Sequence, residues 1–282
     1  MDFALSARAA AAGHRLLAFE TIGSTNAEAL ERARAGERGP LWVVTAAQTA
    51  GRGRRGRPWR DGVGNLAASL LIALDVPIGT AGTLGFVAGL ALAAAIERTA
   101  ATGLRLAADG ASGTAAGKAA RMQLKWPNDV VSDGGKVAGI LLESEPVGSG
   151  ALAVVTGIGV NVTSAPADLP YPAAALNDLG AATDAATLFT ALTDAWLELY
   201  QVWDGGRGLP EIRKRWLEHA AGLGAAVAVK SGERVIRGVF ETLDEEGRLV
   251  VRGPDNEMIA ISAGDVHFGG VATVPTVAPR SA

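Results

Sequence analysis

The sequence predicts an α+β protein, in which a mixed β-sheet packed with helices precedes a small β-barrel. Strand-length apolar segments bounded by glycine and proline recur between residues 41 and 161, and long leucine and tryptophan repeats at helical spacing follow. After Gly224 the pattern changes to short strands with tight turns, as in an SH3-like barrel. We therefore expect a large domain over residues 1–222, a barrel over 223–269 and a disordered tail over 270–282.

Composition narrows the classes of function. The 282 residues are 49% hydrophobic, which is enough for a large core beside a small second domain. The absence of cysteine excludes disulfides, thiolate zinc sites and a cysteine nucleophile, and the three histidines have no metal-ligand spacing. A net charge of -3 disfavours a general nucleic-acid binder, which is usually basic.

The N-terminal residues lack the basic start and apolar run of a signal peptide, so we expect a cytoplasmic protein. The longest apolar run, Leu84 to Ile96, is shorter than the about 20 residues that a membrane span needs. We therefore expect a buried helix there and no membrane partner.

The first half of the chain alternates strands and helices. One of Ser24, Thr25 and Asn26 is placed to cap a helix over residues 27–35. Strands are expected at 41–45 and 65–74, a buried helix at 80–99, and a flexible low-complexity insertion at 107–119.

The second half continues with a strand pattern over 121–131, interrupted by Pro127, and a tight turn at 133–135. The expected partner strand covers 136–143, and a further strand over 151–161 ends at Asn161. The remaining expected elements are helices at 185–203 and 209–220 and barrel strands at 225–230, 234–241, 248–252 and 257–261.

Residues 51–59, which we call the Gly-Arg loop, are the most distinctive stretch. Glycine lets a backbone come close to a ligand, and arginine forms paired hydrogen bonds with carboxylates and phosphates. The loop therefore predicts a site for an anionic small molecule, with a solvated basic turn or a nucleic-acid patch as alternatives. A dinucleotide fingerprint is rejected, because Pro58 and Gly62 interrupt the chain where a helix must begin.

Five motifs, taken in order, resemble biotin protein ligases over about residues 16–268. The resemblance implies a class II synthetase-like sheet domain. It is closest to the monofunctional type, because the 23 residues before Ser24 cannot hold a DNA-binding domain. The motifs are Ser24-Thr25-Asn26, Gln48 with Gly51 to Arg57, Lys125 to Asp129, Lys136 to Gly139, and Gly157 to Asn161.

The resemblance implies a reaction in two steps. Biotin and ATP, with Mg²⁺, form biotinyl-5'-AMP and pyrophosphate, and the biotinyl group then passes to a lysine of a biotin carboxyl carrier domain. It also implies catalytic roles for Lys136, Arg54 and Asp129, and a mobile Gly-Arg loop that closes over the reactive adenylate. The implied biotin-binding residues are Ser24, Thr25, Asn26, Gln48, Arg52, Gly53, Arg54 and Lys136, and the implied nucleotide-binding residues are Arg52, Arg57, Trp59, Asn128 and Asn161.

Two alternatives stay open at this point. The first is a lipoate-type ligase, which shares the adenylation chemistry. The second is a nucleic-acid-binding module, which would not be an enzyme. The resemblance implies no DNA partner and allows a homodimer through sheet edges. Some relatives place an arginine near the nucleotide where this barrel ends with Asp265 to Phe268, so a contribution of the barrel to ATP binding is left open.

Overall fold

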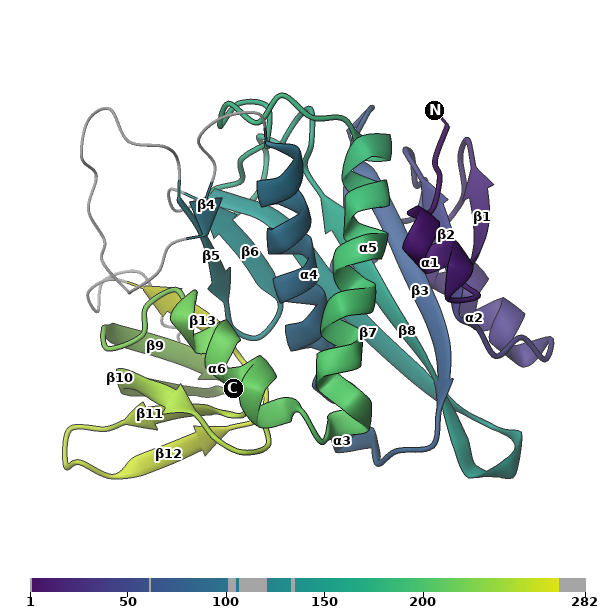
Figure 1. Cartoon of the computed structure of the whole chain (residues 1–282). Coiled ribbons are helices and arrows are strands. Elements are labelled where there is room, and N and C mark those ends of the chain that lie inside the picture. Colours follow the sequence, from purple (N-terminus) through teal and green to yellow (C-terminus); the bar gives the residue numbers. More distant parts are fainter. Residues whose placement is uncertain (1, 61, 101–104, 107–120, 133–134, 269–282) are drawn as a thin grey trace, which may run out of the picture.

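The computed structural model describes residues 2–60, 62–100, 105–106, 121–132 and 135–268. In these residues an eight-stranded mixed sheet with helices precedes a separate five-stranded sheet (Figure 1), which confirms the predicted α+β class. The insertion expected at 107–119, the tail expected at 270–282 and part of the turn at 133–135 lie outside the described residues.

The large sheet has the strand order β1-β2-β3-β8-β7-β6-β5-β4. The pairs β1–β2 and β4–β5 are parallel, and all other neighbours are antiparallel. The strands are β1 Arg15–Phe19, β2 Leu41–Thr45, β3 Leu66–Leu74, β4 Arg105–Leu106, β5 Arg121–Lys125, β6 Asp129–Ser132, β7 Gly135–Val147 and β8 Ala151–Val160.

Helices cover the two faces of the sheet unequally. Helices α4 (Leu84–Thr99) and α5 (Ala185–Trp203) lie side by side across one face (Figure 1), and with α6 (Leu209–Glu218) they enclose the main hydrophobic core. Helix α2 (Thr25–Arg34) packs a smaller apolar cluster on the other face. The rest of that second face is therefore free for a site.

The helix predicted over 80–99 is broken in the structure. Thr83 ends α3 (Ile78–Gly82) and begins α4, and its hydroxyl accepts a hydrogen bond of 2.8 Å from Trp203 Nε1. By length and composition the stretch Ile78–Thr99 is apolar enough to cross a membrane, but 67% of its most apolar window is buried inside the fold. The stretch Ile78–Thr99 therefore belongs to the buried core of the fold.

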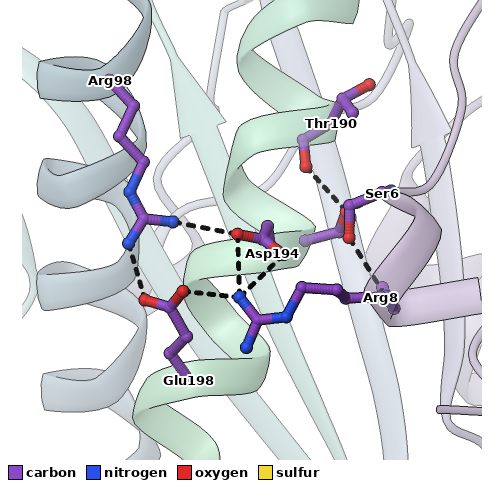
Figure 2. Close-up of polar contacts among 8 residues, drawn as sticks. Ser6, Arg8, Arg98, Thr190, Asp194 and Glu198 are labelled. Atoms are coloured by element: carbon purple, nitrogen blue, oxygen red, sulfur yellow. Dashed lines mark hydrogen bonds and ion pairs between the residues drawn. The ribbon is translucent and has the colours of Figure 1, made fainter. Parts of the chain in front are cut away.

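A short N-terminal helix that the sequence did not predict, α1 (Ala7–Ala11), is fastened to α4 and α5 (Figure 2). Arg8 contacts Asp194 at 3.2 Å and Glu198 at 2.7 Å, and Arg98 of α4 contacts the same two carboxylates. These ion pairs are largely exposed, so each contributes little by itself, but they tie three helices together.

The C-terminal sheet has the order β12-β11-β10-β9-β13, consistent with the predicted SH3-like barrel. Four strands match the prediction closely, and the fifth, β13, was not predicted. The barrel is joined to the large sheet through Ala221 N, which donates to Leu124 O at 2.9 Å, and through Trp126 Nε1, which donates to Gly247 O at 3.2 Å. Its strands are β9 Ala226–Ser231, β10 Arg234–Leu243, β11 Leu249–Arg252, β12 Met258–Ile261 and β13 Asp265–Phe268.

A buried histidine gives the fold a dependence on pH. His14 Nδ1 accepts a hydrogen bond of 3.0 Å from Trp42 Nε1, and burial lowers the pKa of His14 below its usual value. The unfolded chain therefore takes up a proton before the folded chain does as the pH falls. The stability that neutral His14 gives is complete above about pH 6.5 and is lost as the pH falls toward the lowered folded pKa.

We expect His14→Gln, whose amide oxygen can still accept from Trp42, to make the free energy of unfolding less dependent on pH between about pH 7 and 5. Urea denaturation at several pH values measures this slope. His267→Gln is the comparison, because burial also lowers the pKa of His267 and each variant should remove a separate part of the slope. A slope that His14→Gln leaves unchanged would contradict the assignment.

Candidate functional site

A β-bulge places Lys136 on the open face of the sheet. Val131 pairs with Lys136 but Val130 pairs with Ala138, so Val137 is an extra residue in β7. Val137 and Ala138 are both buried in the main core. Because a bulge turns the residues beyond it to the opposite face, Lys136 lies on the same face as Gly139.

A row of residues in direct register crosses this face. Gly139 of β7 pairs with Gly159 of β8 on one side and with Asp129 of β6 on the other. The two glycines leave a flat area that the Trp59 ring occupies. A Cβ at residue 159 would lie 2.4 Å from Trp59 Cε2, and one at residue 139 would lie 3.1 Å from Trp59 Cζ3.

Lys136 lies at the edge of this ring, in a charged and aromatic setting. Its Nζ is 2.7 Å from Asp129 Oδ1, and the two side chains are only 19% and 21% exposed. The same ammonium lies 5.6 Å from the centre of the Trp59 ring and 5.7 Å from that of Tyr171, within cation–π range. Trp59, Lys136, Tyr171 and Asn161 also line a shallow open cleft.

The Gly-Arg loop folds back on itself. Trp59 N donates to Gly51 O at 2.9 Å and Gly53 N donates to Arg57 O at 2.7 Å. The reversal places Arg55 and Gly56 at φ 57° and 72°. A left-handed conformation costs a non-glycine residue roughly 1–2 kcal/mol, so contacts of the loop must offset the strain at Arg55.

Arg54 is directed toward the sheet. Its Nη1 donates to Asn128 Oδ1 at 2.9 Å, while Asn128 Nδ2 donates to Ile140 O at 2.6 Å. Burial lowers the pKa of Arg54, with the charge of Asp265 as the largest opposing effect, but a guanidinium stays protonated in proteins. Arg54 is therefore a half-buried cation held near Asp129, the carboxylate that pairs with Lys136.

A cluster of polar side chains, which we call the polar cluster, lies farther along the same face. Ser24 caps α2, and Gln48 Oε1 accepts from Thr25 N at 2.9 Å. Ser69 of β3 donates to Asn26 Oδ1 at 2.6 Å, and its hydroxyl oxygen lies 2.7 Å from that of Thr25. The polar cluster consists of Ser24, Thr25, Asn26, Gln48 and Ser69.

Glu143 joins the polar cluster to the Gly-Arg loop. Its Oε2 accepts from Asn26 Nδ2 at 2.8 Å and from Arg52 Nη2 at 3.2 Å. Gly157 makes room for Asn26, since a Cβ there would lie 2.1 Å from Asn26 Oδ1. Gly157 and Gly159 are two residues apart on β8, roughly 7 Å, so the polar cluster and the cleft lined by Trp59 are neighbours on one face of the sheet. We call this strip of the face the groove.

Asn161, at the end of β8, brings an unused acceptor to the site. Its Nδ2 donates to Lys136 O at 3.3 Å, but its buried Oδ1 has no hydrogen-bond partner among the residues that the structure describes. A buried amide oxygen in this state is costly and is satisfied when a donor or a cation reaches it.

Lys125, the last residue of β5, is a half-buried cation near the site. Burial lowers the pKa of Lys125, while the carboxylate of Asp129 opposes the shift. Its Nζ is 5.3 Å from the centre of the Phe268 ring, so it lies between the sheet and the barrel.

The structure brings most of the expected residues to one face of the sheet. Arg57 is the exception, because its guanidinium is directed to Asp265 of the barrel at 2.7 Å. Sequence reasoning missed Ser69, Glu143 and Asp265. Ser69 could have been found from the sequence, because it is a hydroxyl residue inside the otherwise apolar strand β3. A buried hydroxyl needs a hydrogen-bond partner, which indicates a polar neighbour.

The arrangement joins two kinds of chemistry. The polar cluster offers neutral donors and acceptors for an uncharged polar ring. Lys136 lies beside the aromatic ring of Trp59 and Arg54 lies near Asp129 and Asn128. Cations of this kind stabilise carboxylates and phosphates. Residues in the described part of the chain contain no group of three His, Asp or Glu side chains able to hold a metal.

Comparison with known proteins relates the chain to ligases. Residues 18–161 match the biotin/lipoate A/B protein ligase family, and residues 222–269 match the biotin protein ligase C terminal domain. The biotin--[acetyl-CoA-carboxylase] ligase of Paracoccus denitrificans is 40% identical over 88% of this chain and 98% of its own length. That of Mycobacterium tuberculosis is 32% identical over 86% and 85% of the two chains.

Solved structures show the same fold. The biotin protein ligase of Aquifex aeolicus with biotin and ATP matches with a TM-score of 0.70 at 22% identity, covering 90% of this chain and 99% of that one. The ligase of Leishmania major with biotinyl-5-AMP matches with a TM-score of 0.56 at 26% identity, covering 89% and 98%.

Gly157→Ala tests the packing of the polar cluster. The new Cβ would displace Asn26, which is held by Ser69 and Glu143, so we expect a loss of about 1–3 kcal/mol in the free energy of unfolding. The control is Gly85→Ala in α4, where the Cβ would be 3.4 Å from its nearest neighbour and alanine favours the helix. Equal stability of both variants in urea denaturation would contradict the described packing.

Proposed function

The chain belongs to the biotin/lipoate A/B protein ligase family, and we propose that it is a biotin protein ligase that forms biotinyl-5'-AMP from biotin and ATP and transfers biotin to a lysine of a carrier domain. The observation that carries the proposal is the groove on the open face of the sheet. There the polar cluster neighbours the Trp59 ring, Lys136 lies at the edge of that ring, and Arg54 reaches Asn128 of the same sheet. This is the order in which a ureido ring, a carboxylate and a phosphate must be held.

The first step brings two anions together, the carboxylate of biotin and the α-phosphate of ATP. Their repulsion is about 4 kcal/mol at 4 Å in a protein-like dielectric. Lys136 and Arg54 are the cations that offset it and that stabilise charge developing on the phosphate. Lys136 must leave Asp129 to do so, which frees the Asp129 carboxylate to orient or deprotonate the acceptor lysine.

The polar cluster suits the ring of biotin. A ureido group has two N–H donors and a carbonyl acceptor, which hydroxyl and amide groups of the cluster can match. Arg52 and Gly53 of the Gly-Arg loop would cover the bound acid, with Arg52 supported by Glu143. The roles proposed here belong to Ser24, Thr25, Asn26, Gln48, Arg52 and Gly53.

The nucleotide would lie over the other end of the groove. Trp59 and Asn161 line the cleft at that end, and Asn128 is held beside it by Arg54. Arg57, paired with Asp265, would act on the phosphates through its charge from the barrel side. The buried Oδ1 of Asn161, which has no hydrogen-bond partner in the described part of the chain, fits Mg²⁺, which takes few protein ligands and binds mainly water and phosphate oxygens. When bound, Mg²⁺ would neutralise phosphate charge.

Further features of the proposal concern organisation. We divide the chain into a catalytic domain over residues 1–222 and a barrel over 223–269, and place the protein in the cytoplasm. Strand β1 is an edge of the large sheet and offers backbone groups for pairing with a second copy or a carrier domain.

The arginines 52, 55 and 57 are each engaged by a carboxylate, which favours a small-anion site over a nucleic-acid surface.

Biotin and lipoate distinguish the proposed function from its nearest alternative. The lipoyl ring has no N–H groups, so binding it would leave the acceptors of the polar cluster without partners. Incubation with ATP, Mg²⁺ and either acid, followed by measurement of pyrophosphate, should show release with biotin and little or none with lipoate. Release with lipoate alone would overturn the assignment.

Lys136→Ala tests the adenylation step. We expect the rate of biotinyl-5'-AMP formation to fall about 100- to 1,000-fold, because one charge that stabilises the transition state is removed. Biotin affinity, measured by calorimetry, should change much less, since the polar cluster is untouched. Lys214→Ala, on an exposed position of α6, is the control. Equal losses in affinity and in rate would contradict a role confined to the chemical step.

A further inference from the structure

The barrel holds the outer side of the Gly-Arg loop through one carboxylate. Asp265, the first residue of β13, accepts from Arg55 Nη1 at 3.1 Å and from Arg57 Nη2 at 2.7 Å, both through Oδ2. The side chains of the two arginines are 40% and 59% exposed, whereas that of Asp265 is 26% exposed. A single half-buried anion therefore pairs with two cations from a loop that is 208 residues away in sequence.

The loop directs its arginines to two sides. Arg54 is turned toward the sheet and Asn128, and no carboxylate lies within ion-pair distance of it among the described residues. Arg55 and Arg57 are turned to the barrel. The sharp reversal at Arg55 and Gly56 produces this division, and the hydrogen bond from Gly53 N to Arg57 O closes it.

The charges around Asp265 agree with this arrangement. Burial alone would raise the pKa of Asp265, but the hydrogen bond from Arg57 and the charges of Arg55 and Arg54 outweigh it, so the pKa lies below its usual value. The carboxylate is therefore ionised at neutral pH. Its charge also reaches Lys125 and Arg54, which lie between the barrel and the groove.

We propose that Asp265 is a positioning residue for adenylation, which pairs with Arg55 and Arg57 on the barrel side so that Arg54 and Trp59 are held over the groove. The inference rests on the proposed function and assigns to the barrel a part in substrate binding. Asp265 acts through the loop and does not touch substrate. Without the Asp265 carboxylate, the loop would become ordered only when substrates bind. The free energy of ordering would then weaken the apparent affinity for substrates and leave the chemical step unchanged.

The test uses the full chain with Asp265→Asn, which keeps the shape and removes the charge. The KM for ATP in biotinyl-5'-AMP formation should rise about three- to ten-fold, as expected for two partly exposed ion pairs, with kcat within two-fold. Glu241→Gln is the matched control, because Glu241 pairs with Arg252 at 2.9 Å within the same barrel and does not contact the loop. Its KM should equal that of the wild type.

Two further measurements separate positioning from folding. Asp265→Arg should raise the KM more than Asp265→Asn does, and adding Arg55→Asp, which restores an opposite-charge pair at residue 55, should reverse part of that rise. In the absence of substrates, trypsin should cleave after Arg54 and Arg55 faster in Asp265→Asn than in the wild type or Glu241→Gln, as identified by mass spectrometry. This readout does not depend on the enzyme reaction, so it stands if the wild type forms no adenylate.

Three results would overturn the proposal. An unchanged KM with unchanged cleavage would show that the ion pairs are incidental. A lower KM would show that Asp265 competes with the nucleotide for the arginines. Failure of Arg55→Asp to reverse any of the effect of Asp265→Arg, with both variants melting cooperatively, would show that the pairing itself is not what matters.

Discussion

The seating of the Trp59 ring on two glycines is the contact on which the site depends. Gly139 and Gly159 are paired across β7 and β8. A Cβ at residue 159 would overlap the ring at 2.4 Å, and one at residue 139 would crowd it at 3.1 Å. The seated ring brings the Gly-Arg loop down onto the sheet, beside Lys136. The absence of side chains at Gly139 and Gly159 is therefore as important for the site as the charged groups around the ring.

The sheet separates stability from chemistry by face. Helices α4 and α5 cover one face with a continuous apolar core, and the opposite face carries α2, the polar cluster and the loop. The bulge at Val137 links the two, because it buries one more apolar residue on the core side and turns Lys136 to the other side. A regular strand would have placed the ammonium in the core, where an unpaired charge is costly.

Local patterns were sufficient to predict the class, most elements and the motif residues, because strand alternation and helical repeats depend on neighbours in sequence. Contacts between distant segments were not visible in this way. Glu143 and Asp265 were missed because their partners lie 91 and 210 residues away. At the helix break, Thr83 is likewise bonded to Trp203, which is 120 residues away. The face on which Lys136 lies follows from a register shift that no local pattern shows. The proposed roles of the motif residues came from the resemblance and remain proposals.

One measurement addresses the central claim directly, a crystal structure of the protein with biotin and a non-hydrolysable ATP analogue. We expect Lys136 Nζ to leave Asp129 and to lie within hydrogen-bonding distance, roughly 2.7–3.2 Å, of both the biotin carboxylate and the α-phosphate. The biotin ring should contact the polar cluster. A complex in which Lys136 stays paired with Asp129 while both ligands are bound elsewhere would contradict the account.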